Sequence, residues 1–244
     1  MSYITITMIA YQDHNLEIVK KVLSGSIAQE MLFPLEFRRT KSRREPYTLA
    51  NAAEFDLSLL LEELDYGDPY LSEYPSFTLN NRDRGLSLKF GFNLEPTQST
   101  TQKSQVLMLS LADREIVDGS IGLATVRPLV EEFISTFMVK YAYASDAQAI
   151  KTLGRAKHFK LPQGFTCNVR LGWISFFGKE YVNYIGRDRF NRLETCLEKL
   201  DVNDGILIVL QEEPFQYANE KHRVREAQAI AELGLEDFLD DQED

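Results

Sequence analysis

The sequence VRLGWISFFGKEYVNYIG, residues 169–186, joins a strand pattern to a helix pattern in one short stretch. Apolar residues crowd its first half around Trp173, the single Trp of the chain. We predict a strand over residues 166–177 and a helix over 179–185, ended by Gly186, a natural left-handed stop. Trp173 then lies in the core with its indole nitrogen bonded to a backbone carbonyl. The alternative is an exposed anchor for a partner.

The rest of the chain repeats these two patterns. Alternation of period two, or a short apolar run, predicts strands at residues 3–9, 86–92, 105–111 and 205–211. Apolar residues at helical spacing predict helices at residues 16–31, 51–64, 128–141 and 219–233. Pro128 suits the first position of the third helix, while Asn51 and Asn219 suit the caps of the second and the last. Asp204-Gly205 is a turn signal directly before the strand at 205–211. The fold class expected is α+β, with a mixed, mainly antiparallel sheet packed against several amphipathic helices.

Pattern breaks divide the chain. Asp146, Gly154 and Pro162 interrupt the periodicity between residues 145 and 163. We therefore expect an N-terminal α+β subdomain at residues 1–144, with a C-terminal α+β subdomain at 145–235 packed closely on it. Residues 236–244 form an acidic tail.

Charge and composition limit the classes of partner. The 244 residues carry a net charge of -10, which argues against general affinity for nucleic acid and favours a basic partner. The basic run at residues 38–44 is read as a charged edge strand, with a nucleic-acid patch as the alternative. No apolar run reaches the roughly 20 residues of a membrane span. Cys167 and Cys196 form no disulfide framework, so we expect a cytoplasmic protein with no membrane partner.

Motifs of catalysis are missing from the sequence. His14, His158 and His222 are scattered, and neither metal-ligand spacing nor a phosphate-binding glycine loop occurs, so we expect no metal and no cofactor. Acidic residues flank the strand predicted at 205–211. They could be the paired carboxylates of an enzyme or a solvated acidic rim, and as a rim they are our candidate partner-binding residues. These residues are Asp201, Asp204, Glu212 and Glu213.

The order of elements in the C-terminal half carries a family resemblance. A long apolar helix at 128–141 precedes GWISFF (172–177), then GILIVLQEEPF (205–215), and finally ANEKHRVREAQAIAELGL (218–235). This order resembles the bacterial immunity protein 52 family and related type VI immunity proteins, in which a Gly-Trp strand, an apolar strand and an Asn-x-x-His helix recur. The resemblance implies a non-enzymatic α+β protein that binds and neutralises a cognate antibacterial toxin. It assigns no toxin-contacting residues.

Three function classes follow from these observations. An immunity protein needs a few anchoring side chains within a polar rim and no catalytic group. An enzyme with dispersed active-site residues would show a cleft with perturbed acids or histidines. An adaptor or structural subunit would show a large apolar patch. We expect the first class, with a basic protein toxin as the partner.

Overall fold

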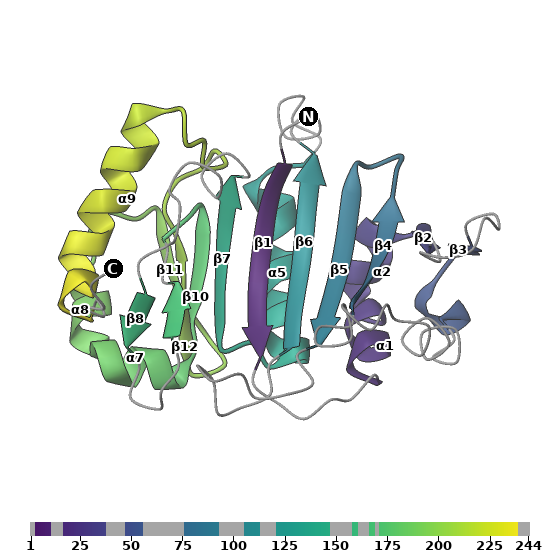
Figure 1. Ribbon diagram of the computed structural model, residues 1–244, viewed down its shortest axis with the longest axis horizontal. Coiled ribbons are helices and arrows are strands. Elements are labelled where there is room, and N and C mark those ends of the chain that lie inside the picture. The colour runs from purple at the N-terminus through teal and green to yellow at the C-terminus, as the bar shows by residue number, and fades with distance from the viewer. Residues whose placement is uncertain are drawn as a thin grey trace.

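An antiparallel sheet of ten strands forms the centre of the molecule, in the order β11-β12-β10-β7-β1-β6-β5-β4-β2-β3 (Figure 1). The computed structural model describes residues 3–10, 17–37, 47–55, 76–92, 105–112, 121–146, 158–160, 166–168 and 171–238. Every strand pair in these ranges is antiparallel. The strands are β1 (Tyr3–Ala10), β2 (Leu35–Phe37), β3 (Tyr47–Leu49), β4 (Ser76–Asn81), β5 (Leu86–Phe92), β6 (Gln105–Ala112), β7 (Tyr141–Asp146), β10 (Ile174–Phe177), β11 (Glu198–Val202) and β12 (Gly205–Val209), with β8 (His158–Lys160) and β9 (Thr166–Asn168) paired separately.

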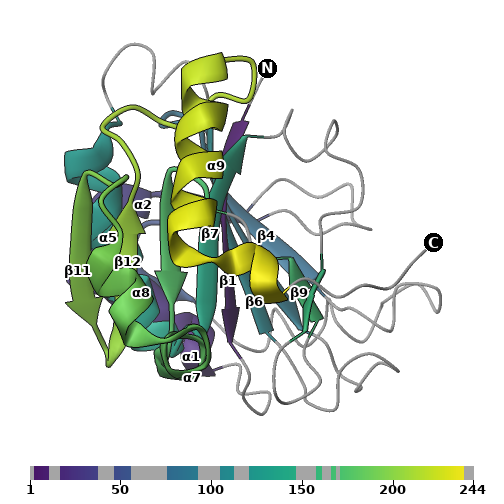
Figure 2. The same ribbon diagram turned by 90° about the vertical axis from the view of Figure 1, so that its left-hand side faces the viewer.

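Helices cover the sheet from two sides and confirm the predicted α+β class (Figures 1 and 2). The group α1, α2 and α5 packs on one face, and α7, α8 and α9 gather on the other face at the β10–β12 end. The helices are α1 (Glu17–Leu23), α2 (Ser26–Leu32), α5 (Leu123–Phe137), α7 (Lys179–Ile185), α8 (Arg187–Arg192) and α9 (Glu220–Leu233), with the 3-10 turns η1 (Ala52–Glu54) and η2 (Leu235–Phe238).

Strand β12 shows why the sequence alternates in some strands and not in others. Its residues Leu207 and Val209 face the core under α5, while Ile206 and Ile208 face the core under α7 to α9. Because both faces are covered, the strand is apolar throughout. In β1 the apolar alternation is regular, since Ile4, Ile6 and Met8 are buried on the α1 and α5 side.

The stretch around Trp173 folds largely as predicted. Trp173 is fully buried, and its indole Nε1 donates a hydrogen bond of 3.1 Å to the carbonyl oxygen of Gln211. The helix α7 has the predicted bounds and ends at Gly186. The single strand predicted over 166–177 is wrong, because β9 pairs with β8 in a small second sheet and β10 begins only at Ile174.

The start of α5 also differs from the prediction. The helix begins at Leu123, and Pro128 lies inside it. The first four N–H groups of a helix have no intrahelical acceptor in any case, so a proline at the sixth position removes only one or two hydrogen bonds. Burial of Leu123 and Val126 extends the apolar stripe by a further turn and offsets that loss.

The helix predicted over 16–31 is divided in two. Helix α1 ends at Leu23, and α2 begins after Gly25, which is its N-cap and has no side chain for capping. The carboxylate of Glu132, on α5, supplies the missing acceptor for the amides of Ile27 and Ala28, at 3.2 and 2.9 Å. The break therefore lets α2 turn its N-terminus towards α5.

Some predictions stay untested, most of them because they concern residues outside the described ranges. The subdomain division at residue 145 stays a prediction, although β7 runs across that position and hydrogen-bonds to both β1 and β10. The basic run at 38–44 and residues 239–244 of the acidic tail lie outside the described ranges. Asn51 caps a helical turn as expected, but this turn is the 3-10 helix η1, and the chain is extended again at Phe55; residues 56–64 of the predicted helix fall outside the described ranges. No helix within these ranges is both long and apolar enough to cross a membrane.

Candidate functional site

The hairpin of β11 and β12 carries the acidic residues singled out in the sequence. Asn203 and Asp204 form its two-residue turn with positive φ angles of 47° and 63°, and Val202 pairs with Gly205. Such angles are those of the tight turns that join antiparallel strands, and Asn-Asp before Gly favours them. The predicted turn at Asp204-Gly205 lies one residue earlier, at Asn203-Asp204, and the prediction missed β11, in which apolar Leu200 and Val202 alternate with Lys199 and Asp201.

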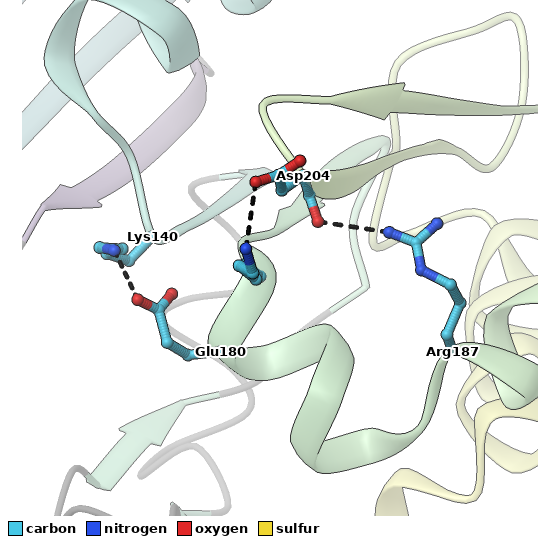
Figure 3. A network of polar contacts seen from close by, with 5 residues as sticks. Lys140, Glu180, Arg187 and Asp204 are labelled. Atoms are coloured by element: carbon cyan, nitrogen blue, oxygen red, sulfur yellow. Dashed lines mark hydrogen bonds and ion pairs between the residues drawn. The ribbon is translucent and has the colours of Figure 1, made fainter.

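The carboxylates of Asp201 and Asp204 are exposed, and each forms an ion pair with a basic side chain. Arg187 Nη1 lies 2.8 Å from Asp201 Oδ1, and Lys179 Nζ lies 3.3 Å from Asp204 Oδ2. Arg187 also donates to the backbone carbonyl of Asp204 at 3.3 Å (Figure 3). These exposed pairs add little stability, but they give the turn end of the hairpin a balanced charge.

A further ion pair extends this network along α7. Lys140 Nζ lies 2.6 Å from Glu180 Oε1 (Figure 3). Partial burial acts to raise the pKa of Glu180, but the hydrogen bond and charge of Lys140, aided by Lys179, outweigh it and lower that pKa. The carboxylate therefore stays ionised and paired, as expected of a structural surface contact.

Glu212 and Glu213 lie at the opposite end of the hairpin. Both are exposed, and no ion pair between described side chains involves them. Because β12 separates them from the turn at about 3.3 Å per residue, the two acidic pairs are roughly 20 Å apart. The four candidate residues therefore form two separate pairs and no continuous acidic face. Whether either pair binds a partner stays a prediction.

A polar pocket adjoins Glu213 at the start of α9. Its volume is about 400 Å³. Asn219 caps α9 by accepting a hydrogen bond of 3.0 Å from the amide of Lys221, as predicted, and so fixes one wall. The sequence prediction did not identify this pocket. Its lining residues are Gln211, Glu213, Gln216, Asn219, Lys221, His222 and Arg225.

His222 is the titratable group of this pocket. Its Nδ1 accepts a hydrogen bond of 3.0 Å from the amide of Gln216, and its Nε2 lies 3.2 Å from Asn219 Nδ2. The ring packs 5.9 Å from that of Phe215. Burial lowers the pKa of His222, Glu213 acts to raise it, and Arg225 lowers it further. A neutral imidazole accepts at only one ring nitrogen, and the Gln216 amide donates to Nδ1, so Nε2 carries the proton and its contact with Asn219 Nδ2 joins two donors and is not a hydrogen bond.

These contacts explain the Asn-x-x-His pattern at residues 219–222. Asn219 caps the helix, and the His222 ring holds the preceding chain at Gln216. Both roles organise the start of α9, so the pattern has a structural reason at this position. No group of three or more possible metal ligands occurs in the described part of the chain. The expectation of no metal or cofactor stays a prediction.

Comparison with solved structures gives an informative likeness, whereas comparisons of sequence do not. No family model matches the chain, so the immunity protein 52 family itself gains no support, and no curated protein matches either. Among solved structures, the Pseudomonas aeruginosa T6SS protein PA0821 superposes with a TM-score of 0.60 and 11% identity, over 96% of this chain and 73% of that one. Identity this low shows the fold alone, and that fold is one found in a protein of the type VI secretion system (T6SS).

Proposed function

We propose that this chain is a type VI-related, non-catalytic immunity protein that binds and neutralises a cognate antibacterial toxin in the cytoplasm. One observation carries the proposal: the likeness of fold to a T6SS protein extends over 96% of the chain. The order of elements from Trp173 to α9, which resembles type VI immunity proteins, supports the same conclusion.

The surface at the start of α9 is the best candidate for the toxin contact. Glu212 and Glu213 are exposed beside a pocket of about 400 Å³, whereas Asp201 and Asp204 already pair with Arg187 and Lys179. Carboxylates without such partners contribute more to the attraction of a basic toxin. The pocket provides a concave site for one anchoring side chain, the feature around which binding energy concentrates.

The two other classes have weaker support. An enzyme would use His222, but the Gln216 amide occupies its Nδ1 and the Asn219 side chain lies 3.2 Å from its Nε2, which favours a structural role. An adaptor would expose a large apolar patch. The exposed large apolar side chains of the described ranges lie apart in the chain: Met138 follows α5, Leu197 precedes β11 and Val224 lies on α9.

Co-expression with a candidate toxin from a neighbouring gene tests the proposal. The wild-type chain is expected to rescue growth and to be recovered with the toxin in a pull-down. The double variant Glu212→Lys with Glu213→Lys is expected to weaken both. The matched control is Glu30→Lys with Asp83→Lys, which makes the same charge change at exposed positions on α2 and in the β4–β5 turn. Continued killing and the lack of any complex with the wild-type chain would refute the proposal.

A further inference from the structure

Strand β11 forms one end of the ten-stranded sheet, and no described strand pairs with its outer edge. It contains five residues, Glu198–Val202, whereas β3 at the other end contains three. Figure 2 shows β11 at the margin of the molecule, with no helix drawn beyond it. An exposed edge of this length presents a row of backbone donors and acceptors to another strand.

The turn determines which backbone groups face outward. Val202 and Gly205 close a two-residue turn, and such a closing pair exchanges both of its hydrogen bonds. Bonded and non-bonded pairs then alternate along the hairpin, so Val202, Leu200 and Glu198 direct their N–H and C=O groups to β12. The backbone groups of Lys199 and Asp201 therefore point away from the sheet.

These two outward residues have opposite charges, and they lie symmetrically about Leu200. If a second copy of β11 lies antiparallel with Leu200 on the two-fold axis, Lys199 of each copy faces Asp201 of the other. The outward backbone groups of Lys199 and Asp201 then meet as hydrogen-bonded pairs. Opposite charges directly across a strand pair are stabilising, so the charges favour this register over shifted ones.

Both side chains already have partners within one chain, so the cross-strand pairs add to these contacts and do not join free charges. Lys199 Nζ donates to the carbonyls of Phe190, Asn191 and Leu193 at 3.3, 3.0 and 2.7 Å. Asp201 is held by Arg187 on the same side of the strand. Leu197, which immediately precedes β11, is 49% exposed and adds apolar surface at the end of the edge.

We propose that two copies of this chain associate through β11, pairing Lys199 of each with Asp201 of the other and joining the two sheets into one. The occupant is a second copy because the charge pattern is self-complementary about Leu200. A closed two-fold pairing of this kind also removes the exposed β11 edge of each molecule.

Charge variants test the register directly. Asp201→Lys places lysine opposite lysine, and Lys199→Asp places aspartate opposite aspartate, so each alone is expected to weaken the dimer about tenfold or more in sedimentation velocity. An equimolar mixture of the two variants restores opposite charges and is expected to recover a heterodimer. Circular dichroism and melting temperature check that each variant folds.

Hydrogen exchange of the wild-type chain gives a second readout that needs no variant. The amides of Lys199 and Asp201 are expected to become protected as the chain concentration rises, while the amide of Leu200, already bonded to β12, stays unchanged. A wild-type monomer at all concentrations overturns the proposal. So does a dimer that both variants leave intact, or protection of Lys199 and Asp201 only when toxin is added. The toxin test above changes Glu212 and Glu213, so the two proposals can fail separately.

Discussion

The side chain of Trp173 is hydrogen-bonded to the backbone of Gln211, since the indole Nε1 donates to the carbonyl oxygen of Gln211 at 3.1 Å. A backbone hydrogen bond joins the same two segments, since the amide of Leu210 donates to the carbonyl oxygen of Trp173 at 3.0 Å. Gln211 also lines the pocket at α9, and its side-chain amide donates to the carbonyl of Glu213 at 2.9 Å. The buried residue before β10 therefore positions the chain that leaves β12 and forms the pocket wall.

Replacement of Trp173 by Phe is expected to destabilise the fold by about 3 kcal/mol. The change leaves a cavity where the second ring was and removes the donor to the Gln211 carbonyl. Urea unfolding followed by circular dichroism measures the difference. Val224→Ala is the control, because Val224 is 58% exposed and its loss is expected to change the unfolding free energy by less than about 0.5 kcal/mol.

Gly172→Ala is expected to prevent stable folding or to cost more than about 3 kcal/mol. A Cβ at position 172 would lie 1.6 Å from the backbone oxygen of Ala144, and the β-sheet backbone cannot move away without breaking its hydrogen bonds. Gly122→Ala is the matched control, since nothing lies within 4 Å of the added Cβ. Equal melting temperatures for the two variants would contradict the close approach of Gly172 and β7.

Glu132→Ala is expected to destabilise the protein by about 1 to 2 kcal/mol, the usual cost of a lost N-cap. The Glu132 carboxylate accepts from the amides of Ile27 and Ala28, and no other side chain caps α2. Glu131→Ala is the neighbouring control. It removes only a half-exposed ion pair with Arg127 and is expected to cost less than about 0.5 kcal/mol in urea unfolding.

The sequence predicted correctly those features that depend on a few adjacent residues. The turn at Asp204, the bounds of α7, the cap of α9 and the bond from the Trp173 indole all follow from a few adjacent residues. The break before α2 does not, because its capping carboxylate comes from Glu132, far along the chain. The same holds for the division of the four acidic residues, since it depends on the direction of β12 and on cations supplied by Arg187 and Lys179.

The pocket at the start of α9 could not be predicted from the sequence, because it too depends on contacts between distant segments. Asn219 and His222 were noted as a pattern, but their partner at Gln216 and the approach of Gln211 depend on how the chain returns from β12 to α9. Spacing at the start of a helix indicates capping and cannot show that a cavity lies beside it. Arg225, one turn after Lys221, was the remaining signal of a polar wall.

The imidazole of His222 is expected to titrate below 6.5 in the folded protein, because burial and Arg225 disfavour the charged form. Protonation of Nδ1 would also break the bond from the Gln216 amide. Since the folded pKa is below the unfolded value, this group stabilises the fold above about pH 6.5, and that contribution is lost as the pH falls through the folded pKa. Imidazole NMR measures the pKa directly. The variant His222→Gln is expected to show a smaller fall in stability between about pH 7 and 5, and an identical fall would contradict the assignment.

Charge reversal at Glu212 and Glu213 is expected to slow association with a basic toxin and to flatten its dependence on salt. Exposed charges act on the encounter rate over about 10 Å at 0.1 M salt, so the loss appears in the association rate more than in the dissociation rate. Reversal at Asp201 and Asp204 is expected to have a smaller effect, because Arg187 and Lys179 already offset those charges. Stopped-flow association at several salt concentrations distinguishes the two ends of the hairpin. A larger effect at the turn end would move the toxin contact there, and no effect at either end would exclude both pairs as the contact surface.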